Sequence, residues 1–301
     1  MDATSPKNTL IPIGLFDFEN YREIVEAIHA VLHMPKDEIH ERLFWEAIQP
    51  GWNTNQTATE FGITPHVYDE RMEEFYNYSQ SFIFELLVSH LDNYCKKIDE
   101  WIANYVSTRF PSPKNTQILA FGDGIGTDSL RFAVAGYRTT YFDFEGYSSR
   151  FALYRFQRQE VREQIHIIHH PSQIPTDTFD VVICREVLEH VPDPFEVIEN
   201  IWNFLQFGGI AFITESFGRV ESAFPTHLAH NKQYDGKTDE MFVQAGFRLL
   251  KIFPDGRTLV FSKTKKTDPT RFDTLNTPEQ EYPVRAPIKR IGKRIVRIFR
   301  S

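Results

Sequence analysis

The stretch QILAFGDGIGTDSL, residues 117–130, decides the fold, because a short apolar run leads through three alternating glycines into a helical pattern. We predict a buried strand over residues 117–121 and a helix that ends at Gly136. Glycines at positions 122, 124 and 126 permit a tight turn and let a ligand approach the main chain. The dinucleotide fingerprint is G-x-G-x-x-G, and here the third glycine comes one residue too early. The loop therefore argues against a nicotinamide cofactor.

Strand and helix patterns alternate from residue 117 onward. Further strands are expected over residues 137–144, 165–170, 179–185 and 208–216, with helices over 147–161 and 194–207. This alternation is typical of βαβ units around a parallel sheet. The stretch FRLLKIFPDGRTLVFSK (247–263) joins two apolar runs through Pro-Asp-Gly, which indicates a hairpin. We predict an α/β fold whose mostly parallel sheet has an antiparallel strand at one edge.

The chain is predicted to divide into three parts. Residues 1–112 have apolar positions at helical spacing and form a helical cap, lid or dimerisation domain, interrupted by a loop over QPGWNTNQT (49–57). Prolines within residues 109–117 mark the boundary to the sheet-bearing domain, 113–265. Residues 266–301 form a C-terminal extension.

Charge is distributed unevenly along the chain. The net charge is −8, and residues 285–301 hold seven Lys or Arg and no acid, so residues 1–284 carry −15 (−8 − 7). An acidic body argues against nucleic acid as a partner. In the tail, isoleucines 288, 291, 295 and 298 share one stripe among basic residues, a pattern that suits the surface of an anionic membrane. A disordered basic tail or a helix packed on another chain are the alternatives.

Cysteine usage and hydropathy predict a cytoplasmic protein. Cys95 and Cys184 have no metal-binding or disulfide spacing, and no secretory segment stands at the N-terminus. No apolar run is long enough to cross a bilayer, so any membrane association would be peripheral.

An acid stands where a nucleotide's ribose would bind. Asp143 ends the second predicted strand, about 20 residues after the glycine loop, where a carboxylate can accept hydrogen bonds from a ribose diol. The alternative is a carboxylate in an exposed turn, with Glu145 equally available. Strand position and spacing favour the ribose role.

The segments ILAFGDGIGTDSL, YFDFEG and FDVVICREVLEHVPDPFEVIENIWNFLQFGGIAFITES together resemble the class I S-adenosylmethionine-dependent methyltransferases. The resemblance covers about residues 115–263 and implies a Rossmann-like sheet with S-adenosylmethionine as cofactor. It implies that Gly122, Gly124 and Gly126 hold the amino-acid end of the cofactor and that Asp143 holds its ribose.

Two positions depart from the family's pattern. Ala120 stands where the family usually has an acid, so Asp123 either replaces that carboxylate toward the methionine ammonium or caps the following helix. His170 stands where the family often has an acid for the adenine amino group, and a neutral imidazole can accept one hydrogen bond.

The stretch CREVLEHVPDP, which follows the fourth strand, lines the reacting methyl group in the resembled family. Arg185 is a cofactor-binding candidate, and His190 is a candidate general base that Glu189 would orient. Related enzymes with E-x-x-E-H bind a divalent metal, which would here use Glu186, Glu189, His190 and His227. A structural turn with no metal is the alternative.

The loop after the fifth strand contains a second candidate base, His227, with His230 three residues later; the alternative is a pair of surface histidines. Aromatic residues over 74–84 suggest a lid with Tyr76 and Tyr78 in the pocket, and the alternative is core packing.

The sequence therefore predicts methyl transfer to an oxygen or nitrogen of a small-molecule or peptidic acceptor, including natural-product or lipid-linked ones, by a protein able to form a homodimer. The alternatives are metal-assisted hydroxyl methylation and a non-catalytic module that binds the cofactor or a partner chain.

Overall fold

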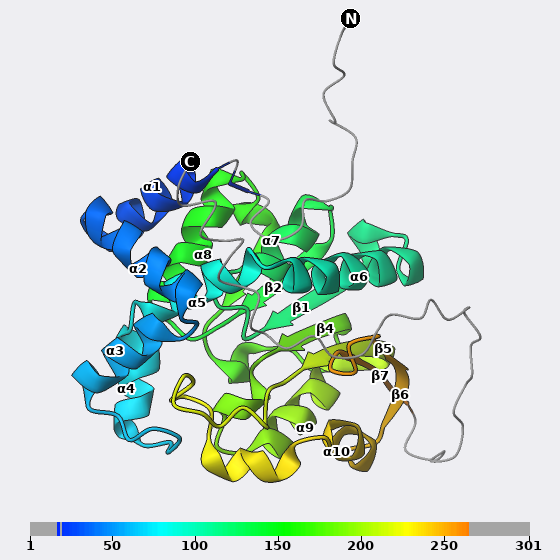
Figure 1. Cartoon of the computed structure of the whole chain (residues 1–301). Coiled ribbons are helices and arrows are strands. Elements are labelled where there is room, and N and C mark those ends of the chain that lie inside the picture. The colour runs from blue at the N-terminus through cyan, green and yellow to red at the C-terminus, as the bar shows by residue number, and fades with distance from the viewer. Residues whose placement is uncertain (1–16, 19, 265–301) are drawn as a thin grey trace, which may run out of the picture.

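The computed structural model describes residues 17–18 and 20–264 (Figure 1). The C-terminal extension 266–301 and the membrane contact predicted for residues 285–301 lie outside the described residues.

A seven-stranded sheet forms the centre of the fold, in the order β3-β2-β1-β4-β5-β7-β6. Strands β1 to β5 are parallel, and β7 is antiparallel to both β5 and β6. The predicted sheet and its hairpin at one edge are thus confirmed. The strands are β1 (Gln117–Phe121), β2 (Arg138–Phe142), β3 (Ile165–Ile168), β4 (Phe179–Arg185), β5 (Leu205–Thr214), β6 (Phe247–Ile252) and β7 (Leu259–Lys263).

Helices cover both faces of the sheet, as Figure 1 shows. On one face lie α6 (Asn93–Arg109), α7 (Thr127–Val134) and α8 (Tyr147–Arg158), and on the other α9 (Pro194–Phe204) and α10 (Thr238–Gln244). Strand alternation determines the division: Ile118 packs with α6, whereas Leu119 and Phe121 pack with α9 and α10.

Five helices before the sheet form the cap. They are α1 (Tyr21–Leu32), α2 (Lys36–Ile48), α3 (Trp52–Phe61), α4 (Glu70–Tyr78) and α5 (Ser81–His90). The apolar core of α1, α2 and α5 includes Ile125 of the glycine loop and Phe151 of α8. The cap is therefore packed against the loop that we expect to hold the cofactor.

Two details differ from the sequence interpretation. The segment 49–57 is not a loop, because α3 begins at Trp52; the buried Glu46 carboxylate accepts hydrogen bonds from the Gly51 and Asn53 N–H groups and so caps this helix. Helix α6 packs on the sheet through Ile98, Ile102 and Val106. The domain boundary at residue 112 stays a prediction, and the packing of α6 favours one near residue 92.

Within residues 17–18 and 20–264, every helix is too short or too polar to cross a bilayer.

Candidate active site

The glycine loop follows β1 at the carboxyl edge of the sheet, and all three glycines have left-handed backbone angles. The φ values of Gly122, Gly124 and Gly126 are 70°, 50° and 77°. A Cβ on Gly122 would lie 2.5 Å from Val187 Cγ2, and one on Gly124 would lie 2.6 Å from Leu86 Cδ1 of the cap. Side chains of the protein itself therefore require glycine at positions 122 and 124.

Asp123 caps helix α7. One carboxylate oxygen accepts a hydrogen bond from the Asp128 N–H (3.0 Å) and the other from the Ser129 N–H (2.8 Å). Burial, together with the Asp128 carboxylate, raises the pKa of Asp123 to about 7. These two hydrogen bonds support the capping alternative. Binding of the methionine ammonium by Asp123 stays a prediction.

Asp143 lies directly beside the glycine loop. Its Oδ2 accepts a hydrogen bond from the Gly124 N–H at 2.6 Å, and burial raises the pKa of the carboxyl to about 6. The ring Nδ1 of His169 donates to the Asp143 carbonyl (2.9 Å), a contact that the sequence analysis missed. His170 is exposed and its Nδ1 lies 2.7 Å from the Ser172 hydroxyl, so its contact with adenine stays a prediction.

Arg185 ends β4 in a buried cluster of charges. Its Nη1 lies 2.6 Å from Asp99 Oδ1 of α6 and 3.3 Å from Asp128 Oδ2 of α7. Arg131 pairs with the same two carboxylates at 2.6 and 2.9 Å. Burial opposes ionisation of Asp99, but Arg185 and Arg131 outweigh it and lower its pKa to about 2. The cluster fixes Arg185 behind the glycine loop; its predicted contact with the cofactor is untested.

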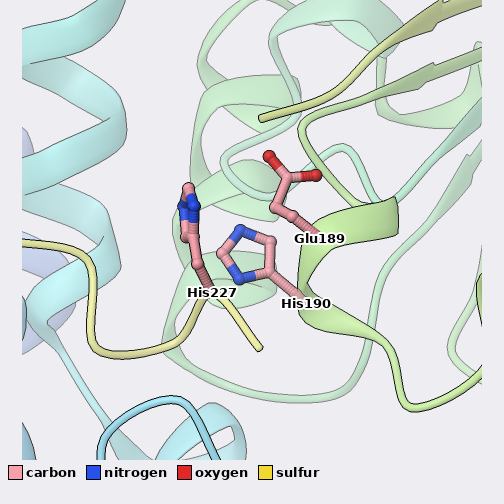
Figure 2. A group of neighbouring side chains, drawn as sticks. All are labelled: Glu189, His190 and His227. Atoms are coloured by element: carbon pink, nitrogen blue, oxygen red, sulfur yellow. The ribbon is translucent and has the colours of Figure 1, made fainter. Parts of the chain in front are cut away.

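Glu189, His190 and His227 come together at the same edge, and their potential ligand atoms lie within 4.8 Å of one another. Glu189 and His190 project from the turn η4 (Leu188–His190), whereas His227 comes from the loop after β5 (Figure 2). The buried Asn231 amide donates to the carbonyls of Leu188, Glu189 and Val191, and so holds the turn in place: these contacts measure 3.2, 3.3 and 2.9 Å.

Three features set the chemistry of this cluster. Burial, then His190 and Arg219, lower the pKa of His227 to about 2, so its ring is neutral. Its Nδ1 is buried without a hydrogen-bond partner among the residues that the structure describes. Neither carboxylate oxygen of Glu189 has a partner in residues 17–18 and 20–264. Burial and the neighbouring Glu186 raise the pKa of Glu189 well above its ordinary value.

Among the described residues, Glu189 therefore makes no hydrogen bond to either histidine, and its orienting role stays a prediction. His190 is held instead through Nδ1, which lies 3.1 Å from the Thr226 carbonyl and 3.0 Å from the Tyr76 hydroxyl of the cap. Because a carbonyl oxygen only accepts, Nδ1 carries the proton and Nε2 is left as the acceptor. Tyr78 is 66% exposed, so its place in the pocket stays a prediction.

Glu186 does not belong to the three-residue cluster. Its backbone is left-handed (φ 51°), and its carboxylate accepts hydrogen bonds from Ser216 Oγ (2.5 Å) and from Arg257 Nη2 (3.2 Å). Arg257 belongs to the Pro-Asp-Gly turn between β6 and β7, which the sequence identified only as a turn. The predicted fourth metal ligand is therefore paired with an arginine. His230 is exposed, and its Nε2 lies 2.9 Å from the Pro192 carbonyl.

Comparison with known proteins decides the family. The sequence model of a family described as a methyltransferase domain matches residues 91–252, which is 162 of the 301 residues. The chain belongs to the methyltransferase domain family. This confirms the predicted class I S-adenosylmethionine-dependent methyltransferase, its fold and its cofactor. The match begins at residue 91, so it includes α6 and leaves out the cap.

Curated relatives of this methyltransferase match it over limited segments. A ubiquinone biosynthesis O-methyltransferase of Colwellia psychrerythraea is 37% identical over 79 residues, 26% of each chain. One of Haemophilus ducreyi is 29% identical over 119 residues, 37% of this chain and 50% of that protein. The chain thus spans half the length or less of these two relatives.

Among solved structures, a putative sarcosine dimethylglycine methyltransferase from Galdieria sulphuraria aligns with this protein. The alignment covers 70% of this chain and 98% of the chain of that structure. The TM-score is 0.46 and the sequence identity is 12%.

Proposed function

We propose that this methyltransferase transfers the methyl group of S-adenosylmethionine to an oxygen or nitrogen of a small-molecule or peptidic acceptor, and that His227 accepts the proton. The observation that carries the proposal is the shared edge: the glycine loop, Asp143 and the Glu189–His190–His227 cluster all follow the carboxyl ends of β1, β2, β4 and β5. Ligands of open α/β sheets bind at that edge.

The cofactor side of the site uses the loop at residues 122–126 and Asp143. The donor set fits a nucleoside with an amino-acid end, because left-handed glycines expose the main chain and Asp143 offers a carboxylate at the end of β2. S-Adenosylmethionine supplies a methyl group already activated on a sulfonium, so this chain mainly has to position the acceptor and take its proton.

His227 is better suited than His190 to accept that proton. The buried Nδ1 of His227 has no partner among the described residues, whereas His190 has only Nε2 left as an acceptor, because its Nδ1 donates to the Thr226 carbonyl. A hydroxyl or amine becomes more acidic as its oxygen or nitrogen gains the methyl group and the sulfonium leaves, so a weak base suffices to take its proton late in the reaction.

Two measurements test the proposal. Calorimetric titration with S-adenosylmethionine and S-adenosylhomocysteine comes first, and absence of binding to both would leave only the non-catalytic alternative. Release of S-adenosylhomocysteine is then measured with a panel of phenols, aliphatic alcohols and amines. Turnover with any of them identifies the nucleophile class, and cofactor binding without turnover across the panel counts for a binding module.

A second candidate is metal-assisted methylation of a hydroxyl. The observation that favours it is the pair of unpartnered, buried Glu189 oxygens beside two imidazoles, a donor set that fits Mg²⁺ or Mn²⁺. A bound ion would lower the pKa of the acceptor hydroxyl. Chelation separates the two candidates: a general-base enzyme keeps its turnover in EDTA, and a metal-dependent one loses it until Mg²⁺ or Mn²⁺ is restored.

A further inference from the structure

His66 links the cap to the loop that contains His227. It lies between α3 and α4, and its backbone is left-handed with φ 68°, which is uncommon for a residue other than glycine. Such conformations persist where the surrounding structure holds them, and they are concentrated at functional sites. The contacts of this residue therefore call for an explanation.

Three hydrogen bonds join His66 to the loop. The His66 N–H donates to the Pro225 carbonyl (2.7 Å), and the Ala229 N–H donates to the His66 carbonyl (3.0 Å). Between these two bonds, the ring Nδ1 of His66 lies 2.8 Å from the carbonyl oxygen of His227. A carbonyl only accepts, so the ring donates through Nδ1–H and its tautomer is defined.

The opposite side of this loop is held by η4. The Leu228 N–H donates to the Glu189 carbonyl (3.0 Å), and the Thr226 carbonyl accepts from His190 (3.1 Å). The neighbours of His227 are thus bound to the sheet side, while its own carbonyl is bound to the cap by one histidine ring.

We infer that His66 is a positioning residue, which fixes the backbone at His227 and thereby the direction of that ring. The inference rests on the proposed function only in giving His227 a catalytic role. Misplacement of a reacting group by about 1 Å costs on the order of a hundredfold in rate. A donor at residue 66 therefore contributes to turnover without touching the acceptor.

Two substitutions at residue 66, to Asn and to Asp, have side chains of the same shape and differ in whether they can donate a hydrogen bond. They therefore separate the positioning role from general packing. In His66→Asn, the amide nitrogen stands one bond beyond Cγ, as Nδ1 does, and can donate to the His227 carbonyl. In His66→Asp, an oxygen in that place can only accept. Both residue types tolerate left-handed backbone. His33→Asp is the matched control, since His33 is an exposed cap histidine with φ 56°.

NMR of the full chain labelled with ¹⁵N-histidine reads the tautomer and mobility of each ring without an acceptor, with His227→Gln identifying the His227 signals. We expect the Nδ1–H tautomer for His66 in the unsubstituted protein. We expect narrow His227 signals in that protein, in His66→Asn and in His33→Asp, and shifted, broadened ones in His66→Asp. With an acceptor in hand, His66→Asp turns over about ten- to a hundredfold more slowly, with unchanged cofactor affinity.

Three results would overturn the inference: another tautomer at His66, unchanged His227 signals in His66→Asp, or equal disturbance by both substitutions. Unfolding of either variant also counts against it, since that would indicate a general structural role. Failure of the proposed function looks different, because His227→Gln would then keep its turnover whatever the NMR spectra show.

Discussion

The cofactor half and the acceptor half of the site are built in different ways. The cofactor half consists of one short loop and Asp143, which the chain supplies within 22 residues (122–143) and which meet through a backbone N–H. The acceptor half combines side chains from α4, η4 and the loop after β5, separated by as many as 151 positions (76 to 227). Main-chain geometry determines the first half, and packing between distant segments determines the second. The predictions below test this difference, from the largest expected effect to the smallest.

In the acceptor half, the loss of a single side chain should greatly reduce turnover. We expect His227→Gln to lower turnover by about a hundred- to ten-thousandfold, because a general base of this kind contributes that much. Affinity for S-adenosylmethionine, measured by calorimetry, should stay unchanged. His230→Gln, at an exposed position three residues along, is the control. Equal losses in the two variants would contradict the assignment of the base.

In the cofactor half, a substitution that disturbs the backbone of the glycine loop should reduce stability. A Cβ on Gly126 would lie 2.5 Å from Phe156 Cζ and 2.8 Å from Ala152 Cβ. We expect Gly126→Ala to lower the free energy of unfolding by about 2–4 kcal/mol, from left-handed strain and overpacking together. Gly236→Ala is the control, because it also has positive φ (72°) but nothing within 4 Å, so only the strain remains. Urea denaturation of both variants measures the difference, and equal losses would show that packing at Gly126 is unimportant.

Asp143 contacts the glycine loop, and its carboxylate, proposed to hold the ribose, should matter more for binding than for turnover. We expect Asp143→Asn to weaken binding of S-adenosylhomocysteine by roughly ten- to a hundredfold, since hydrogen bonds to charged groups contribute about 1.5–3 kcal/mol. Glu145→Gln, at an exposed residue two positions later, should bind as the unsubstituted protein does. Unchanged affinity in Asp143→Asn would remove the ribose assignment.

His90 belongs to the buried charge cluster of Asp99, because its Nδ1 lies 4.0 Å from Asp99 Oδ2. Burial lowers the pKa of His90 to about 4, against about 6.5 in the unfolded chain. Its contribution to stability is therefore present above pH 6.5 and is lost as the pH falls toward 4, because only the unfolded chain takes up the proton. We expect His90→Gln to reduce the fall in melting temperature between pH 6.5 and 4, and His33→Gln to leave it unchanged. An identical pH dependence in all three proteins would contradict the prediction.

The sequence predicted the parts of the fold that local patterns determine. Alternating strands and helices indicated the sheet, and the spacing from the glycine loop to Asp143 indicated which residues would meet, since parallel strands end at a common edge. Helix α3 was missed because its cap is Glu46, a side chain from the preceding helix, whereas the segment itself contains turn-forming residues. A cap supplied from elsewhere in the chain leaves no local pattern.

The acceptor half was predicted by residue type but not by contact. The E-x-x-E-H pattern drew attention to Glu186, yet Arg257, 71 positions later, pairs with that carboxylate. The sequence did not predict that His66 contacts His227 or that Tyr76 contacts His190, because both contacts depend on how the cap packs on the sheet. A histidine in a cap loop, taken from sequence alone, has no feature that distinguishes it from a surface residue.

The hydrogen bonds between His66 and residues 225–229 have a consequence for redesign of this protein. The Asn55 amide also donates to the Ala223 carbonyl (3.0 Å), so the segment 223–229 shares its hydrogen bonds with the cap as much as with its own domain. A chimaera that replaces residues 17–90 alone would lose the side-chain hydrogen bonds of Asn55 and His66 to this segment. The unit to transplant is discontinuous: the cap together with residues 223–229.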